Sequence, residues 1–226
     1  LRHVIAIDAD DFIAVDEGQG EKMRQEVWDY VGETMTDDIT GGGWQSSYTG
    51  EALSREVMDD YGDNALEKLR PFLSSSTRVL EIGCASGITM FRVAPLVGRY
   101  LGTDLSPRIL DWSRREAENR GLARIRLEPL AAHEIDRLDE GDFDIVIINS
   151  VLQCFSGHNY LRSVLEKAIA LMKPEGRIFL GNVFDRERRD AFLHSLVEYK
   201  RAHPEARTKT DYSEELFIDR AFLEDL

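Results

Sequence analysis

Two acidic residues and two glycines are spaced in a way that suits a nucleotide-like ligand. In Val79-Leu80-Glu81-Ile82-Gly83-Cys84-Ala85-Ser86-Gly87, an apolar run ends at a glycine-containing bend, and a helical pattern follows. Glycines there allow a sharp strand-to-helix turn and a close approach of a ligand to the backbone. Asp104 lies 23 residues after Glu81, at the end of the next apolar run. A carboxylate at that position can accept hydrogen bonds from both ribose hydroxyls.

The acid before the first glycine separates two kinds of nucleotide ligand. A dinucleotide site requires G-x-G-x-x-G with a pyrophosphate at the following helix, but Ala85 and Ile88 replace the second and third glycines here. The charge of Glu81 would repel a pyrophosphate and attract a cation. S-adenosylmethionine has no phosphate and carries a sulfonium and an ammonium. The pattern therefore favours S-adenosylmethionine over NAD, and the structural alternative is a tight turn that binds nothing.

The elements that must position these residues follow an alternating pattern. Short apolar runs, which predict strands, alternate with helical patterns; the runs lie at 79–82, 100–103, 125–127, 143–148 and 177–181, and the helical patterns at 89–97, 107–120 and 159–172. This alternation predicts βαβ units and a parallel sheet. The runs are apolar on both faces, as in strands covered by helices on each side. The sequence thus predicts an α/β fold with a mostly parallel, Rossmann-like sheet, and Lys173-Pro174-Glu175-Gly176 is predicted to separate the last helix from its strand.

The segment before the sheet has a different character. Helical patterns at 21–31 and 52–72 flank a polar, glycine-rich loop at 36–50. We therefore expect an N-terminal helical or lid region at 1–73 and a ligand-binding core at 74–226. A length of 226 residues suits one such domain. Because the chain opens on Leu1 rather than methionine, we expect a domain cut from a longer chain or a trimmed sequence.

Composition limits the partners and the compartment. The 28 basic and 42 acidic residues give a formal charge of −14, which disfavours nucleic acid and anionic membrane surfaces as partners. No apolar run approaches the length of about 18 residues that a membrane span needs, and the start of the chain is not a signal peptide because aspartates interrupt it. Cys84 and Cys154 do not suggest a disulfide scaffold. These features predict a cytoplasmic protein.

Several motifs together resemble a known family. VLEIGCASG, YLGTDLSP, FDIVIINSVLQCF and LMKPEGRIFLGNV resemble, in order and spacing, the motifs of class I S-adenosylmethionine-dependent methyltransferases. The flanks, Gly43 to Glu51 and Glu215 to Asp219, are similar to methyltransferase domains embedded in nonribosomal peptide synthetases and polyketide synthases. The resemblance covers roughly Trp28 to Leu226. It implies S-adenosylmethionine as cofactor, no metal, a substrate on the phosphopantetheine arm of an acyl or peptidyl carrier protein, and neighbouring synthase domains as partners.

The resemblance also implies residue roles. Glu81, Gly83 and Gly87 would surround the methionine end of the cofactor, with Asp104 on the ribose. Other residues expected at the cofactor are Ala132 and His133 beside the adenine, Asn149 closing the crevice, and Trp44, Tyr48, Cys84, Ala85, Leu105, Ser106 and Ser150.

Three features of this expected site depart from the family or stay open. Ala85 stands where the family usually has glycine, which tightens the pocket by one methyl group. The chain also ends at Leu226, before the antiparallel strand pair such folds usually carry. Two roles are equally expected for Trp44 and Tyr48: a lid over the cofactor, or an aromatic staple that holds the N-terminal helices together.

Methyl transfer needs positioning and, for an alcohol or amide nucleophile, a general base. Of the five histidines, only His133 and His158 are predicted on loops at the carboxyl edge of the sheet. We expect His158 to be the catalytic base; the alternative is a helix-start residue that satisfies backbone groups. Gln153 occupies the position of a histidine in some O-methyltransferases of this fold, and we expect it, with Tyr48, to contact substrate.

The expected reaction is O-methylation of a carrier-tethered intermediate. Nitrogen methylation is the next alternative, because the nitrogen-methylating domains of peptide synthetases share the NSV-x-Q and W-x-S-S-Y-T-G features. The carbon methyltransferases of polyketide synthases resemble a different pattern, with a glycine-richer first motif and a histidine directly after the fourth strand. Two alternatives from other classes are a catalytically silent cofactor-binding domain and a nicotinamide-dependent oxidoreductase. The missing glycines count against the oxidoreductase.

Overall fold

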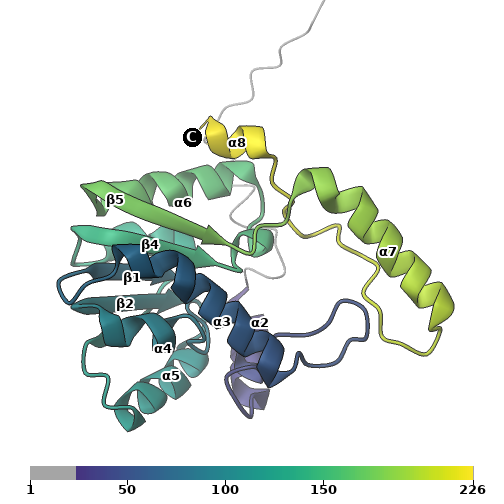
Figure 1. Ribbon diagram of the computed structural model, residues 1–226, viewed down its shortest axis with the longest axis horizontal. Coiled ribbons are helices and arrows are strands. Elements are labelled where there is room, and N and C mark those ends of the chain that lie inside the picture. Colours follow the sequence, from purple (N-terminus) through teal and green to yellow (C-terminus); the bar gives the residue numbers. More distant parts are fainter. Residues whose placement is uncertain (1–23, 226) are drawn as a thin grey trace, which may run out of the picture.

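A five-stranded parallel sheet forms the centre of the computed structural model, which describes residues 24–225 (Figure 1). The strand order is β3-β2-β1-β4-β5, and every neighbouring pair is parallel; the strands are β1 (Arg78–Ile82), β2 (Arg99–Asp104), β3 (Ile125–Pro129), β4 (Phe143–Asn149) and β5 (Met172–Gly181). The order reverses between β1 and β4, and ligands of open α/β sheets bind outside the carboxyl ends of the strands at such a reversal. The predicted Rossmann-like fold is confirmed.

Alternate side chains of each central strand pack into two separate cores. Leu80 and Ile82 of β1 face α6 (His158–Ala170) in one core. Val79 faces the opposite core, with α4 (Met90–Val93) and α5 (Pro107–Asn119). This two-sided burial explains why the strands read as continuous apolar runs. It also holds the carboxyl ends of β1 and β4 rigidly side by side.

Local sequence signals set the helix starts around the sheet. The Ser106 hydroxyl accepts a hydrogen bond from the Ile109 amide (3.3 Å) at the start of α5, and Pro107 occupies the first helical position. Both are standard helix-start features. Helix α4 is short and continues into η4 (Ala94–Leu96), since Pro95 interrupts the pattern predicted at 89–97.

Strand β5 begins earlier than the sequence suggests. The motif Lys173-Pro174-Glu175-Gly176 was expected to separate helix from strand, but α6 ends at Ala170 and β5 starts at Met172. Phe143 pairs with Met172 and Ile145 pairs with Arg177, so residues 173–176 leave the ladder as an irregularity inside the strand. The prediction of the strand start was therefore wrong by five residues, because proline and glycine are tolerated at a bulge of an edge strand.

The N-terminal region covers one side of the sheet edge. It contains α2 (Gln25–Thr34), η2 (Thr40–Gly42), α3 (Arg55–Leu69) and η3 (Arg70–Phe72). Helix α2 packs on α5, and the Ser106 hydroxyl donates a hydrogen bond to Asp29 (2.6 Å). The boundary expected at residue 73 falls between η3 and β1. Residues 1–23, with His3, the apolar start and the first part of the helix expected at 21–31, lie outside the described residues.

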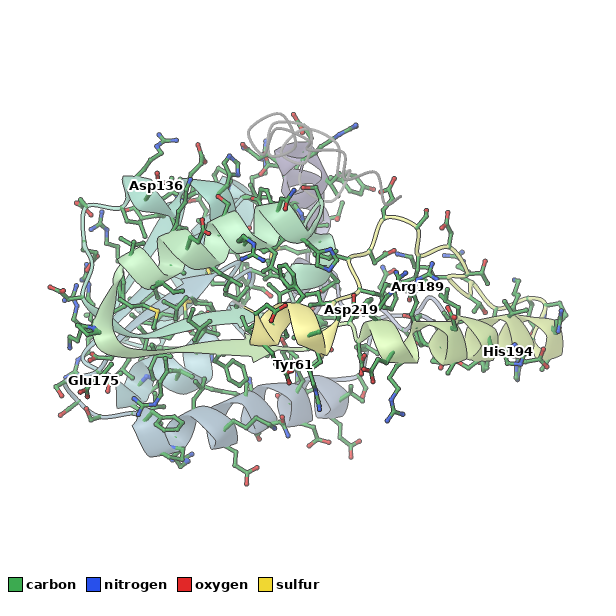
Figure 2. The ribbon with its side chains drawn as sticks, turned by 90° about the horizontal axis from the view of Figure 1, so that it is seen from above. Tyr61, Asp136, Glu175, Arg189, His194 and Asp219 are labelled. Atoms are coloured by element: carbon green, nitrogen blue, oxygen red, sulfur yellow. The ribbon has the colours of Figure 1, made fainter. Side chains whose placement is uncertain are left out.

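The C-terminal region extends beyond the carboxyl end of β5, where α7 projects away from the sheet (Figure 1). It contains η7 (Arg186–Arg188), α7 (Arg189–Ala202) and α8 (Arg220–Glu224), and the segment after α7 returns beside residues 47–49. A small aromatic core including Phe184, Tyr212 and Phe217 joins these parts. His194 lies on α7, away from the sheet (Figure 2). Within residues 24–225, no helix has the length and apolarity to cross a membrane.

Candidate active site

A cavity of about 560 Å³ lies at the carboxyl edge of β1, β2 and β4. This volume is typical of small-molecule sites. One part is lined by the bend after β1 and the end of β2; another is lined by the loop after β4, by residues 42–50 and by the C-terminal segment. The cavity therefore occupies the crevice that the strand order predicts.

The bend after β1 can be built only with small residues. Gly83 has φ +73°, and a Cβ there would lie 2.5 Å from a methyl group of Val151. Gly87 has φ +87°, and a Cβ there would lie 2.6 Å from the ring of Phe91. Ala85 also has a positive φ, 43°, which costs a residue other than glycine about 1–2 kcal/mol. The backbone thus keeps a conformation that favours glycine even where this chain has alanine.

Glu81 is a buried carboxyl group at the floor of this bend. It is 3% exposed, and the Tyr100 hydroxyl donates a hydrogen bond to it (2.7 Å). Burial raises the pKa of Glu81 to about 8, the Tyr100 hydrogen bond opposes this rise, and the nearby Asp104 carboxylate adds to it. Among residues 24–225, no positively charged side chain pairs with this buried carboxyl group. A cationic ligand in the cavity would supply that partner.

Asp104 holds the bend against the end of β2. Its two carboxylate oxygens accept hydrogen bonds from the amides of Ala85 (2.9 Å) and Ser106 (3.0 Å). Burial raises the pKa of Asp104, and these backbone hydrogen bonds oppose the rise. Apolar side chains continue the wall beyond it, among them Leu105 and Ala132. A carboxylate followed by an apolar wall suits a ribose joined to a flat base.

The end of β4 carries a strained polar cluster. Ser150 and Asn182 both have positive φ, 63° and 52°, and the Asn182 amide donates to the Ser150 hydroxyl (2.6 Å). The Gln153 amide nitrogen donates to the Ser150 carbonyl (2.8 Å). Its oxygen is buried and has no hydrogen-bond partner among residues 24–225. Asn149 donates to the Thr89 hydroxyl (3.0 Å). Strain concentrated at a cavity wall is typical of functional sites.

Comparisons with known proteins agree with this geometry. A family model described as a methyltransferase domain matches residues 80–178. The chain is 40% identical over 141 residues to the probable nonribosomal peptide synthetase CymA of Salinispora arenicola, covering 62% of this chain and 2% of that protein. It is 33% identical over 213 residues to chondramide synthase cmdD of Chondromyces crocatus, covering 89% of this chain and 5% of that protein.

Solved structures show the same fold. The N-methyltransferase NodS from Bradyrhizobium japonicum superposes with a TM-score of 0.53 at 17% identity, covering 66% of this chain and 84% of that one. The chain is a class I S-adenosylmethionine-dependent methyltransferase domain. It is related to the methylation domains of peptide synthetases.

Most of the cofactor residues expected for this methyltransferase domain line one cavity. They are Trp44, Glu81, Gly83, Cys84, Ala85, Gly87, Asp104, Leu105, Ala132, Asn149 and Ser150, and Gln153 lines it as well. Cys84 and Cys154 both line it as well. Residues 24–225 contain no group of three or more His, Cys, Asp or Glu side chains that could hold a metal ion.

Four residues expected at the site do not line the cavity. Ser106 is buried beneath it as the cap of α5. His133 lies behind it, with its Nδ1 3.0 Å from the Tyr160 hydroxyl, and Tyr160 lines the cavity instead. Tyr48 does not line the cavity, and its hydroxyl bonds the Ser195 hydroxyl of α7 (2.9 Å), a contact that neither the expected lid nor the expected staple of the N-terminal helices included.

Of these four residues, His158 matters most for the mechanism, because it was expected to be the catalytic base. It begins α6, and its ring packs edge-on against Phe222 of α8 with centroids 4.7 Å apart. Because the side chain turns toward the C-terminal helix rather than toward the cavity, the geometry does not support the expected role as general base. His158 is the first residue of α6, as the helix-start alternative expects, although no side-chain hydrogen bond caps the helix there.

Several cavity residues come from elements that the motif analysis did not use. Tyr61 points from α3 toward the sheet (Figure 2); its ring lies 4.8 Å from that of Trp44, and its hydroxyl bonds Ser150. Burial and the charge of Glu81 raise the pKa of Tyr61. Other such residues are Trp28 of α2 and Phe184, Arg207, Lys209, Tyr212 and Glu215. For Trp28 and Tyr61, the available signal was an aromatic residue within a predicted helical pattern.

Proposed function

We propose that this methyltransferase domain transfers a methyl group to the α-amino nitrogen of an aminoacyl group carried by a peptidyl carrier protein. The two related proteins given are a probable nonribosomal peptide synthetase and a chondramide synthase, and the chain spans only 2% and 5% of their lengths. Their names support a substrate with an amino-acid backbone. The neighbouring domains of such a synthetase would be the partners.

The residues at the bend fit S-adenosylmethionine. Glu81 offers a buried carboxyl group to a cation, and Asp104 offers a carboxylate to hydroxyl groups. Gly83 and Gly87 leave backbone accessible where side chains would clash. When bound, S-adenosylmethionine supplies a methyl group on a positively charged sulfur. The chain's own contribution is to hold the acceptor close and in line with that methyl group, which is where most of the acceleration arises.

We choose nitrogen as the methyl acceptor because none of the described residues that line the cavity is a histidine, the usual general base. An alcohol must lose its proton to a base as it reacts. An α-amino group has an ordinary pKa of about 8 and is substantially neutral near that pH, so its lone pair attacks without prior help. The Trp44 and Tyr61 rings, the Ser150 cluster and Gln153 would orient that amine.

Oxygen methylation, which the sequence favoured, is the second candidate, and Glu215 supports it. Glu215 is a buried carboxylate that lines the cavity and pairs with Lys209. A carboxylate in that position could take a proton from a hydroxyl group.

A competition between matched carrier substrates tests the proposal. The domain is incubated with S-adenosylmethionine and one carrier protein loaded either with an aminoacyl group or with the corresponding hydroxyacyl group, and the products are weighed by mass spectrometry. We expect a mass gain of one methylene on the aminoacyl substrate, located on nitrogen by fragmentation. Methylation of the hydroxyacyl substrate alone would establish the second candidate.

A further inference from the structure

The cavity has a cationic rim in a strongly acidic chain. Arg207 and Lys209 both line it, and both residues are exposed. The chain as a whole carries a formal charge of −14, and the inner wall holds the carboxyl groups of Glu81 and Asp104. Positive charge at this one edge would attract an anionic group of a ligand whose reacting end lies deeper in the cavity.

Backbone pairing fixes the position of this rim. The amides of Arg207 and Lys209 donate to the carbonyls of Thr49 (3.3 Å) and Ser47 (2.9 Å), and the Thr208 hydroxyl donates to the Tyr48 carbonyl (2.7 Å). Gly50 has φ +74°, and a Cβ there would lie 2.5 Å from the Cβ of Arg207. The approach of the two segments therefore requires glycine at position 50, and the rim residues are held in place.

The two cations differ in availability. Lys209 pairs with the buried Glu215 and lies 4.5 Å from the centre of the Tyr212 ring. Arg207 has no ion pair and no side-chain hydrogen bond with any residue in the 24–225 range. A guanidinium group can bond two oxygens of a phosphate at once. Arg207 is thus the member of the pair with free charge.

We propose that Arg207 binds the phosphodiester of the phosphopantetheine arm that carries the methyl acceptor. This inference rests on the proposed function, because it requires a tethered substrate. The carboxylate of a free amino acid fits less well, since it lies two bonds from the amine. An amine placed at the buried end of β4, where Asn149 is 8% exposed, would keep that carboxylate inside the cavity, far from an exposed rim. A phosphate at the far end of an extended arm can reach the rim.

Matched substrates with and without the phosphate test the proposal. The same aminoacyl thioester is prepared on pantetheine and on phosphopantetheine, and KM is measured for the wild-type domain, Arg207→Gln and the control Arg220→Gln, which alters an exposed arginine of α8 outside the cavity. We expect the phosphate to lower KM about tenfold in the wild type and in the control, the effect of one charge-assisted contact. The ratio of the two KM values should fall to about one in Arg207→Gln. Titration of unreactive phosphopantetheine and pantetheine analogues in the presence of S-adenosylhomocysteine should show the same ratio in Kd.

The outcomes separate this inference from the proposed function. Equal KM and Kd values with and without phosphate in the wild type would overturn the role of Arg207, while methylation of either thioester would still support the proposed function. Methylation of neither thioester would count against the proposed function, and the Kd ratio would then decide the anion site by itself. Arg207-dependent methylation of a free amino acid would overturn the phosphate assignment. Thermal melting and S-adenosylhomocysteine affinity establish that Arg207→Gln is folded.

Discussion

Substitution of Glu81 by glutamine tests how the bend binds its cofactor. Glutamine has the same shape and can still accept the Tyr100 hydrogen bond, but it carries no charge. With a pKa of about 8, Glu81 in the ligand-free domain is ionised to about 1% at pH 6, about 10% at pH 7 and about half at pH 8. If the ionised form binds the cation, S-adenosylmethionine affinity should rise about tenfold between pH 6 and pH 7, rise about fivefold more between pH 7 and pH 8, and level off only above that pH.

The Glu81→Gln variant should lose both the charge and this pH dependence. We expect Kd to be about 10- to 100-fold weaker than wild type at pH 8, from the loss of one charge-assisted contact, and to stay nearly constant from pH 6 to pH 8. Calorimetric titration over that range measures both effects, and Tyr100→Phe serves as a control. Because the Tyr100 hydrogen bond opposes the rise of the pKa, its loss should move the wild-type pH dependence upward.

The stability of the ligand-free domain should change in the opposite sense. The pKa of Glu81 is higher in the folded protein than its ordinary value, so its contribution to stability is present below about pH 4.5 and is lost as the pH rises through about 8. Glu81→Gln should therefore unfold at a higher temperature than wild type at pH 8. Wild-type affinity in the variant, or an unchanged pH dependence, would refute the role assigned to the carboxyl group.

Three further substitutions probe the site. Gly83→Ala should destabilise the domain by about 2–4 kcal/mol in urea unfolding and weaken cofactor binding, because of its positive φ and the clash with Val151; Val151→Ala in the same chain should restore part of the loss, and an unaffected single variant would contradict the packing. Ala85→Gly should raise the unfolding free energy by about 0.5–1 kcal/mol, because relief of the positive φ exceeds the entropy cost of glycine; a clear loss of stability would argue against strain there. His158→Ala should keep kcat within about twofold and lose about 1 kcal/mol of stability through the contact with Phe222; a hundredfold fall in kcat would restore its role as base.

The sequence predicted the sheet well because burial on both faces leaves a local signature. Val79, Leu80 and Ile82 are apolar for two different cores, and a run of this kind needs no knowledge of distant contacts. The start of β5 was missed because Pro174 and Gly176 read as a turn, whereas the edge of a sheet accommodates them in an irregular strand.

The sequence predicted only those site residues whose positions depend on a single strand and the bend that follows it. Glu81, Gly83 and Asp104 follow directly from strand ends, and their places in the cavity depend on the parallel order of β1 and β2. His158 was misplaced because its direction depends on Phe222, 64 residues later in the chain. Arg207 reaches the cavity through backbone pairing with Thr49, a contact across the sequence that no local pattern encodes.

One binding measurement tests most directly whether the bend after β1 holds a positively charged methyl donor. The wild-type domain is titrated in a calorimeter with S-adenosylmethionine, S-adenosylhomocysteine and NAD at pH 8, where about half of the Glu81 carboxyl groups are ionised. We expect saturable binding of S-adenosylmethionine and S-adenosylhomocysteine and none of NAD. Binding of NAD alone, or of none of the three by a folded domain, would contradict the assignment of this cavity.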